Sequence, residues 1–159
     1  MLLRRLALLP ALLLAVAVAP APASAAFTFP KVGARLGAEP SVGKGRDAAP
    51  QGLRTKDVVR GDGRRAQTGD VLTVHYVGVL YGSGRPFDAS WDAGSPFAFQ
   101  LGAGGVIRGW DEGLRGMRVG GRRTLVLPPR FAYGRAGRPP AIPRRATLTF
   151  AVDLLRVQR

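Results

Sequence analysis

The feature that most constrains the fold is the stretch VLTVHYVGVL at residues 71–80, where apolar and other side chains alternate with a period of two. This period is typical of a β-strand, because successive side chains of a strand point to opposite faces of the sheet. One face is predicted to carry Leu72, Val74, Tyr76 and Leu80. Tyr76 shares its face with aliphatic residues, so it is predicted to point toward the core. The neighbouring His75 lies on the other face and points away from the core.

Shorter segments of similar character surround this strand. Further strands are predicted at residues 53–60, 97–101, 123–127 and 147–157, and a short amphipathic helix at residues 110–117. Glycines in the connections permit the positive φ angles that tight turns require. The order of elements predicts an α+β fold in which a bent antiparallel sheet of about five strands wraps around one short helix.

The first 52 residues are predicted to lie outside this domain. Residues 1–25 combine Arg4 and Arg5, an apolar run and the small-residue site at 23–25, as a signal peptide does. The run is too short for a comfortable bilayer span, so we expect no stable membrane anchor. Residues 26–52, rich in proline and glycine, are expected to be a flexible linker, with residues 53–159 as the globular domain. An exported protein, secreted or periplasmic, is the preferred location, and an organelle lumen is the alternative.

Composition excludes several classes of site. The chain has no cysteine and one histidine, so disulfides, thiolate metal sites and histidine metal cages are not expected. We therefore predict no metal and no cofactor. The formal net charge of +14 would suit a nucleic-acid partner, but the basic residues are scattered singly or in pairs. A solvated basic surface without a nucleic-acid partner is the simpler interpretation, and adhesion to anionic surface polymers stays open.

Six short motifs follow one another in the predicted domain. They are VHYVG at 74–78, FDAS at 87–90, PFAF at 96–99, VIRGWDEG at 106–113, FAYG at 131–134 and IP at 142–143. In order and spacing they resemble the FKBP family, the macrolide-binding peptidyl-prolyl cis/trans isomerases. The resemblance implies a monomer that binds proline-containing polypeptides and accelerates the folding of exported proteins, with macrolides as candidate inhibitors and without a cofactor.

The resemblance also implies one pocket for the prolyl substrate. Its catalytic residues would be Asp88, Tyr133, Trp110 and Phe87, and its substrate-binding residues would be Tyr76, Phe97, Val106, Ile107, Ile142 and Phe150. A proline ring would sit over the Trp110 indole, and the Ile107 amide and the Tyr133 hydroxyl would bond the ligand's carbonyls. Asp88 would act electrostatically, without transferring a proton. Such a pocket would stabilise the twisted prolyl amide non-covalently.

Simpler explanations exist for several of these residues. Aromatic residues are often plain core, and Asp88 taken alone could cap a turn. The acidic pair at 111–112 is better explained by the positive end of the helix dipole than by acid/base chemistry. The chain also departs from the family pattern, with Ala93 where many members have an arginine, with glycines at 104–105 and with Arg138. A non-catalytic chaperone or proline-peptide binding module therefore stays the alternative to an isomerase.

Overall fold

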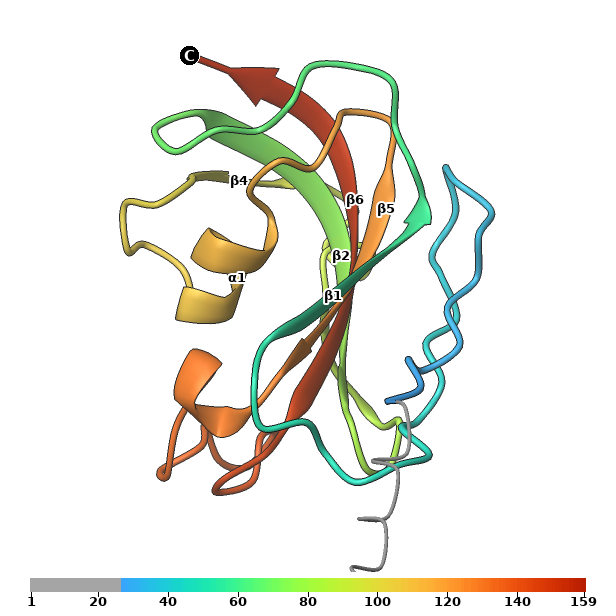
Figure 1. The fold of residues 1–159 in the computed structure, drawn as a ribbon, viewed down its shortest axis with the longest axis vertical. Coiled ribbons are helices and arrows are strands. Elements are labelled where there is room, and N and C mark those ends of the chain that lie inside the picture. The colour runs from blue at the N-terminus through green and yellow to red at the C-terminus, as the bar shows by residue number, and fades with distance from the viewer. Residues whose placement is uncertain (1–26) are drawn as a thin grey trace, which may run out of the picture.

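The structure, a computed structural model, describes residues 27–159 (Figure 1). Its elements are β1 (Arg54–Val59), β2 (Val71–Leu80), β3 (Pro86–Ala89), β4 (Phe97–Gln100), α1 (Arg108–Gly113), β5 (Arg122–Leu127), the 3-10 helix η1 (Pro129–Phe131) and β6 (Leu148–Gln158). The α+β prediction is confirmed, but the sheet has six strands. The additional strand is β3, a four-residue segment that begins with proline and shows no alternation. The expected signal peptide lies outside the described residues.

All six strands belong to one antiparallel sheet built around β2 and β6. The order is β1-β5-β6-β2-β3, and β4 pairs with the first half of β2. Strand β2 pairs with β6 along its whole length, with a register shift between Thr73 and Val74. Such irregularities bend a strand and increase its twist. The sheet therefore curves around α1, which lies on one side of it in Figure 1, while the chain before β1 lies on the other.

The side of the sheet that α1 covers is called the front face, and it holds the main core. As predicted, Leu72, Val74 and Tyr76 belong to this cluster. Helix α1 lies close to β5 because of Gly109 and Gly113. A Cβ atom on either glycine would come within 2.4 Å of a leucine side chain of β5. Neither α1 nor η1, the helices of the described part of the chain, is long and apolar enough to cross a bilayer.

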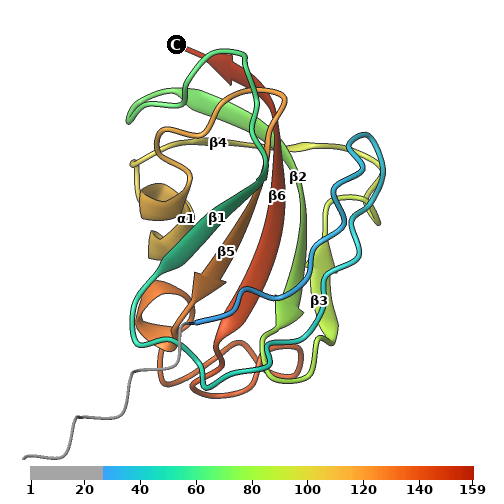
Figure 2. The ribbon, with the colours of Figure 1, turned by 45° about the vertical axis from the view of Figure 1, so that its right-hand side comes forward.

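The opposite face, called the back face, is covered by residues 27–52, which we call the arm (Figure 2). The arm doubles back on itself, with an antiparallel bridge between Val32 and Val42. It is joined to the domain by a 2.7 Å hydrogen bond from the Gly45 amide to the Tyr81 carbonyl. We expected a flexible linker here. The described part of that segment instead packs on the sheet.

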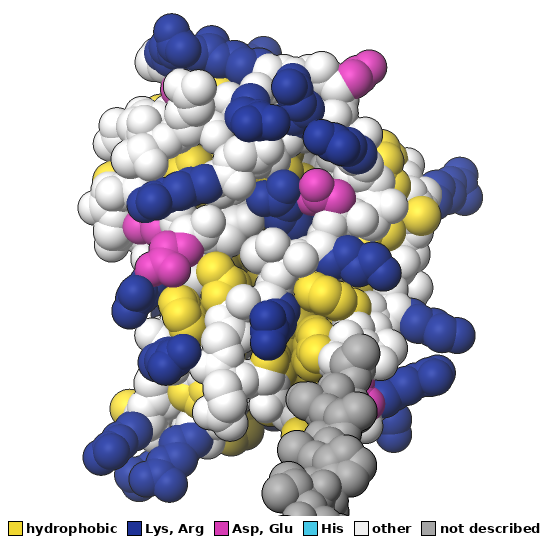
Figure 3. Space-filling model, in the orientation of Figure 1, with side chains coloured by type: hydrophobic (Ala, Val, Ile, Leu, Met, Phe, Trp, Pro, Cys, Tyr) yellow, Lys and Arg dark blue, Asp and Glu magenta, His cyan; other side chains and the backbone are white. Residues whose placement is uncertain are grey.

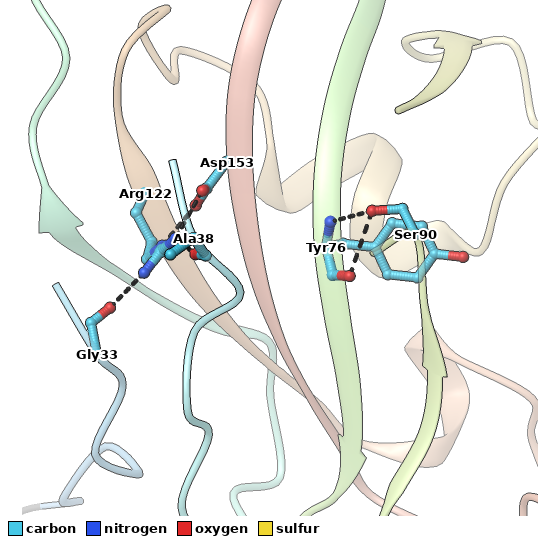
Figure 4. A network of polar contacts seen from close by, with 6 residues as sticks. All are labelled: Gly33, Ala38, Tyr76, Ser90, Arg122 and Asp153. Atoms are coloured by element: carbon cyan, nitrogen blue, oxygen red, sulfur yellow. Dashed lines mark hydrogen bonds and ion pairs between the residues drawn. The ribbon is translucent and has the colours of Figure 1, made fainter. Parts of the chain in front are cut away.

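A buried arginine connects the arm to two strands (Figure 4). The side chain of Arg122 is fully buried, and its Nε and Nη2 donate to the two carboxylate oxygens of Asp153 at 2.5 and 2.6 Å. Its Nη1 and Nη2 also donate to the carbonyls of Gly33 and Ala38, at 2.6 and 3.0 Å. A buried charge is costly unless it is paired and hydrogen-bonded. The arm carbonyls complete the set of acceptors that this arginine needs.

Candidate active site

A cavity of about 360 Å³ opens on the front face beside α1. Elements far apart in the sequence contribute to its lining, which consists of Tyr76, Asp88, Phe97, Gly104, Gly105, Val106, Ile107, Trp110, Tyr133, Arg138 and Phe150. An aromatic cavity with a few converging polar groups is the usual form of a site for a small or extended ligand.

Trp110 forms the floor of this cavity. Only 4% of the residue is exposed. The rings of Tyr76 and Phe150 meet it edge-on, at centroid distances of 5.1 and 5.4 Å and interplanar angles of 83° and 86°. Phe97 approaches from a third side at 6.2 Å. Edge-to-face contacts are a favoured geometry for aromatic pairs, so the indole is held in one orientation.

The aromatic wall depends on a glycine of β2. A Cβ atom on Gly78 would lie 2.7 Å from the Phe87 ring and 2.8 Å from the Phe150 ring. Without one, these two rings pack edge-on over the strand at a centroid distance of 5.6 Å. Glycine at this position therefore lets Phe87 pack against Phe150, which forms part of the pocket wall.

Asp88 provides the carboxylate of the lining, and it is anchored by a neighbour. The hydroxyl of Tyr76 donates to its Oδ2 at 2.7 Å. Burial, together with the hydrogen bond and the negative charge of Asp88, raises the pKa of Tyr76 well above its usual value. Tyr76 therefore stays protonated and keeps donating to the carboxylate. Within residues 27–159, no Lys or Arg lies at ion-pair distance from Asp88, which agrees with Ala93 standing where an arginine is common.

Hydrogen-bond donors of the lining are left without protein acceptors. The Ile107 carbonyl accepts from the Trp110 amide at 2.9 Å, but the Ile107 amide donates to no acceptor in the described region. The Tyr133 hydroxyl likewise donates to no acceptor among those residues. The buried Trp110 Nε1 has no partner there either. Buried polar groups are normally satisfied, so open donors around a cavity mark a place where a ligand can bind.

The loop before α1 is fixed by the first acidic residue of the helix. Asp111 is buried, and its two carboxylate oxygens accept hydrogen bonds from the amides of Gly102 and Gly104 at 2.8 and 3.0 Å. This carboxylate therefore shapes the glycine-rich rim of the cavity. The second acidic residue, Glu112, pairs with Arg108 on the surface at 2.6 Å.

Known proteins share this arrangement. The family described as FKBP-type peptidyl-prolyl cis-trans isomerase matches residues 62–155. The chain belongs to this family. The FK506-binding protein of Streptomyces anulatus is 51% identical over 109 residues, which are 68% of this chain and 88% of that relative. The peptidyl-prolyl cis-trans isomerase FKBP2 of Mus musculus is 50% identical over 95 residues, 60% of this chain and 67% of that relative.

The fold comparison agrees. The crystal structure of AtFKBP13 superimposes with a TM-score of 0.63 and 38% sequence identity, covering 68% of this chain and 94% of the other. The chain is thus an FKBP-type prolyl isomerase, with the family's bent sheet around one short helix.

Most residues that the sequence assigned to the FKBP pocket do line the cavity. The exceptions are Phe87 and Ile142. Phe87 is partly exposed and packs edge-on against Phe150 at 5.6 Å, and Ile142 is 3% exposed and pairs through both backbone groups with Arg138, at 2.9 and 3.0 Å. Both were expected in the lining, both contact residues that line the cavity, and their own place in the pocket stays a prediction.

Sequence reasoning missed other residues at this FKBP pocket. Gly104, Gly105 and Arg138 stood out as departures from the family pattern, not as lining residues, yet all three border the cavity. Asp111 was attributed to the helix dipole, and its role in holding the rim was not foreseen. The signal for the glycines was their position directly before Val106. Nothing in the sequence indicated that Asp111 reaches back nine residues.

Proposed function

We propose that the front-face cavity catalyses prolyl isomerisation by holding the proline over Trp110 and stabilising the twisted amide. The barrier to rotation about a prolyl amide is about 18 to 20 kcal/mol, because rotation breaks the C–N resonance. No bond is made or broken, so neither a nucleophile nor a metal is needed. Only interactions that favour the twisted state over the planar one accelerate the step.

The apolar floor supplies the first of these interactions. A planar amide is more polar than a twisted one, because resonance separates charge between nitrogen and oxygen. Transfer from water to an aromatic cavity therefore costs the planar amide more than the twisted amide. Each preference of about 1.4 kcal/mol for the twisted form raises the rate tenfold. Trp110 and its edge-on neighbours would provide this surface.

The hydrogen-bond donors without a protein acceptor supply the second interaction that favours the twisted amide. They are the observation that carries the proposal. The Ile107 amide and the Tyr133 hydroxyl have no acceptor in the described part of the protein. A bound peptide offers carbonyls on either side of the prolyl bond. Holding both carbonyls in the twisted geometry would use donors already in place, which costs little reorganisation.

Asp88 would act through its charge. The Tyr76 hydroxyl fixes the carboxylate at 2.7 Å, so it keeps a defined position at the cavity. A fixed negative charge at the edge of the cavity interacts with the amide dipole, and water weakens this interaction because Asp88 is exposed. This role requires no proton transfer, consistent with a neutral tyrosine as its partner.

The substrates would be proline-containing segments of exported proteins. Support for export comes from residues 1–25, which combine a basic start, an apolar run and a small-residue cleavage site. Mass spectrometry of the protein recovered outside the cytoplasm tests this. A chain that begins at Ala26 is expected, and a chain that retains residue 1 would contradict cleavage.

The isomerase test uses a peptide with leucine before proline and follows cis-to-trans exchange by NMR. We expect turnover, inhibition by FK506, and a loss of about tenfold or more in kcat/KM for Trp110→Ala. Because removal of a buried tryptophan costs about 3 to 5 kcal/mol of stability, rates are scaled to the folded fraction measured by circular dichroism. Unchanged turnover per folded Trp110→Ala molecule would refute the proposed pocket.

A further inference from the structure

One cationic side chain stands in the lining of the cavity. Arg138 belongs to the loop between η1 and β6, and its backbone is fixed by two hydrogen bonds to Ile142, at 2.9 and 3.0 Å. Its side chain is exposed, with the guanidinium carbon 6.0 Å from the centre of the Tyr133 ring. The base of this side chain is therefore held in place while its charged end faces solvent at the cavity mouth.

The charge around Arg138 is not balanced within the loop. Residues 130–145 contain five exposed arginines and no acidic residue, and these arginines are Arg130, Arg135, Arg138, Arg144 and Arg145. None of them takes part in an ion pair among residues 27–159. On the face shown in Figure 3, basic side chains are widely spread and acidic ones occur in few places. The field at the mouth is thus positive on the loop side.

The carboxylates of this region bear differently on that field. Glu112 is paired with Arg108, whereas Asp88 accepts a hydrogen bond from the neutral Tyr76 and keeps its negative charge in the lining, so the positive field belongs to the loop side of the mouth. If Tyr133 and the Ile107 amide hold the carbonyls that flank a proline, the side chains next to that proline leave the cavity at its mouth. Arg138 lies against Tyr133, so it is placed to meet one of those side chains.

We propose that Arg138 makes this isomerase select proline segments with an acidic residue next to the proline. The inference rests on the proposed function and names its substrate class. Arg138 would be a specificity residue rather than a catalytic one, because it acts on a neighbouring side chain and not on the rotating amide. Exposed ion pairs are weak, so the expected preference for glutamate over glutamine is about two- to fivefold in kcat/KM at low salt.

The experiment compares peptides that differ only by glutamate or glutamine, placed before or after the proline, with the leucine peptide as an uncharged reference. In the wild-type protein, the glutamate-to-glutamine ratio should exceed one at one of the two positions, mainly through KM. The ratio should approach one in about 1 M salt, where the screening length falls to about 3 Å.

Variants assign the effect to one side chain. Arg138→Lys should keep the ratio, Arg138→Gln should bring it toward one, and Arg138→Glu should push it below one. The matched control is Arg35→Gln, which removes the same charge from an exposed position on the arm, across the sheet. It should leave the ratio unchanged.

Two results would overturn the inference in distinguishable ways. A wild-type ratio of one at both positions, or a full ratio in Arg138→Gln, would contradict the acidic preference while turnover of the leucine peptide upholds the proposed function. No turnover of the leucine peptide by the wild-type protein would contradict the proposed function, and the acidic preference with it.

Discussion

The Arg122 site on the back face and the cavity on the front face treat polar groups in opposite ways. The contrast is between these two sites and not between whole faces, since Trp91 Nε1 and the hydroxyls of Thr124 and Thr149 are also buried without partners among residues 27–159. On the back face, each side-chain nitrogen of Arg122 donates a hydrogen bond, to Asp153 or to carbonyls of the arm. On the front face, Trp110 Nε1, the Ile107 amide and the Tyr133 hydroxyl lack acceptors within residues 27–159. The same six strands carry both arrangements.

This difference separates stability from function. Satisfying all the donors of a buried charge such as Arg122 stabilises one packing of the chain, whereas open donors that line a cavity cost stability and are available to a ligand. We therefore expect changes on the back face to alter the free energy of unfolding, and changes at the polar groups of the front face to alter turnover.

The largest effect is expected at the back-face ion pair. Asp153→Ala leaves the fully buried Arg122 without its carboxylate. Removing one partner of a buried pair typically costs about 3 to 5 kcal/mol. Urea denaturation at neutral pH should show a loss of this size in the free energy of unfolding.

A double variant is the control for that loss. Arg122→Met combined with Asp153→Leu removes both charges, so no unpaired charge is buried. It should recover much of the stability that Asp153→Ala loses. A double variant as unstable as the single one would mean that shape rather than charge is decisive.

The contact between arm and sheet gives the next effect. A Cβ atom on Gly45 would lie 2.0 Å from the Tyr81 ring, whereas one on Gly52 meets no atom within 4 Å. Gly45→Ala should therefore destabilise the protein by about 1 to 3 kcal/mol, as overpacking does. Gly52→Ala is the matched control and should change stability little. Equal stabilities in thermal unfolding would argue that the arm is not packed on the sheet.

A smaller effect, on turnover, is expected at the front face. Tyr133→Phe removes one donor, which is worth about 0.5 to 1.5 kcal/mol for a neutral hydrogen bond. The kcat/KM for the leucine peptide should fall about two- to tenfold, and the free energy of unfolding should stay close to that of the wild type. A stability loss without a change in rate would reverse the assignment of the two faces.

The smallest effect is a pH dependence at Tyr76. Burial and Asp88 raise its pKa above the usual tyrosine value of about 10. The unfolded chain then releases the phenolic proton at a lower pH than the folded protein does. The free energy of unfolding should therefore fall as the pH rises above about 10. Urea denaturation at pH 9 and pH 11 should show a smaller fall in Tyr76→Phe, and identical falls would contradict the coupling.

The sequence predicted the fold where local patterning is strong. Alternation in residues 71–80 located β2 and assigned Tyr76 to the core face correctly, because period two in a half-buried strand is a direct consequence of the pleat. Strand β3 has only four residues, which is too short to show such a period. The packed arm escaped notice because Arg122 meets its carbonyl partner 89 residues away, and proline-rich sequence gives no sign of a distant acceptor.

The pocket was predicted mainly through the resemblance to the FKBP family. The sequence did not show that Phe87 packs edge-on against Phe150 over Gly78, or that Ile142 is buried and paired with Arg138, because neither contact follows from a local pattern. The hydrogen bonds that Asp111 accepts were not predicted for a related reason, since they depend on a glycine loop that folds back onto the helix. Family patterns identify residue types, and the depth of each side chain comes from tertiary contacts.

The most direct test of the division between the faces measures kcat/KM per folded molecule for Asp153→Ala and Trp110→Ala, on the same peptide and under conditions where both variants fold. We predict that Asp153→Ala stays close to the wild-type value although it is less stable, and that Trp110→Ala loses about tenfold or more. Equal losses in the two variants would contradict the account.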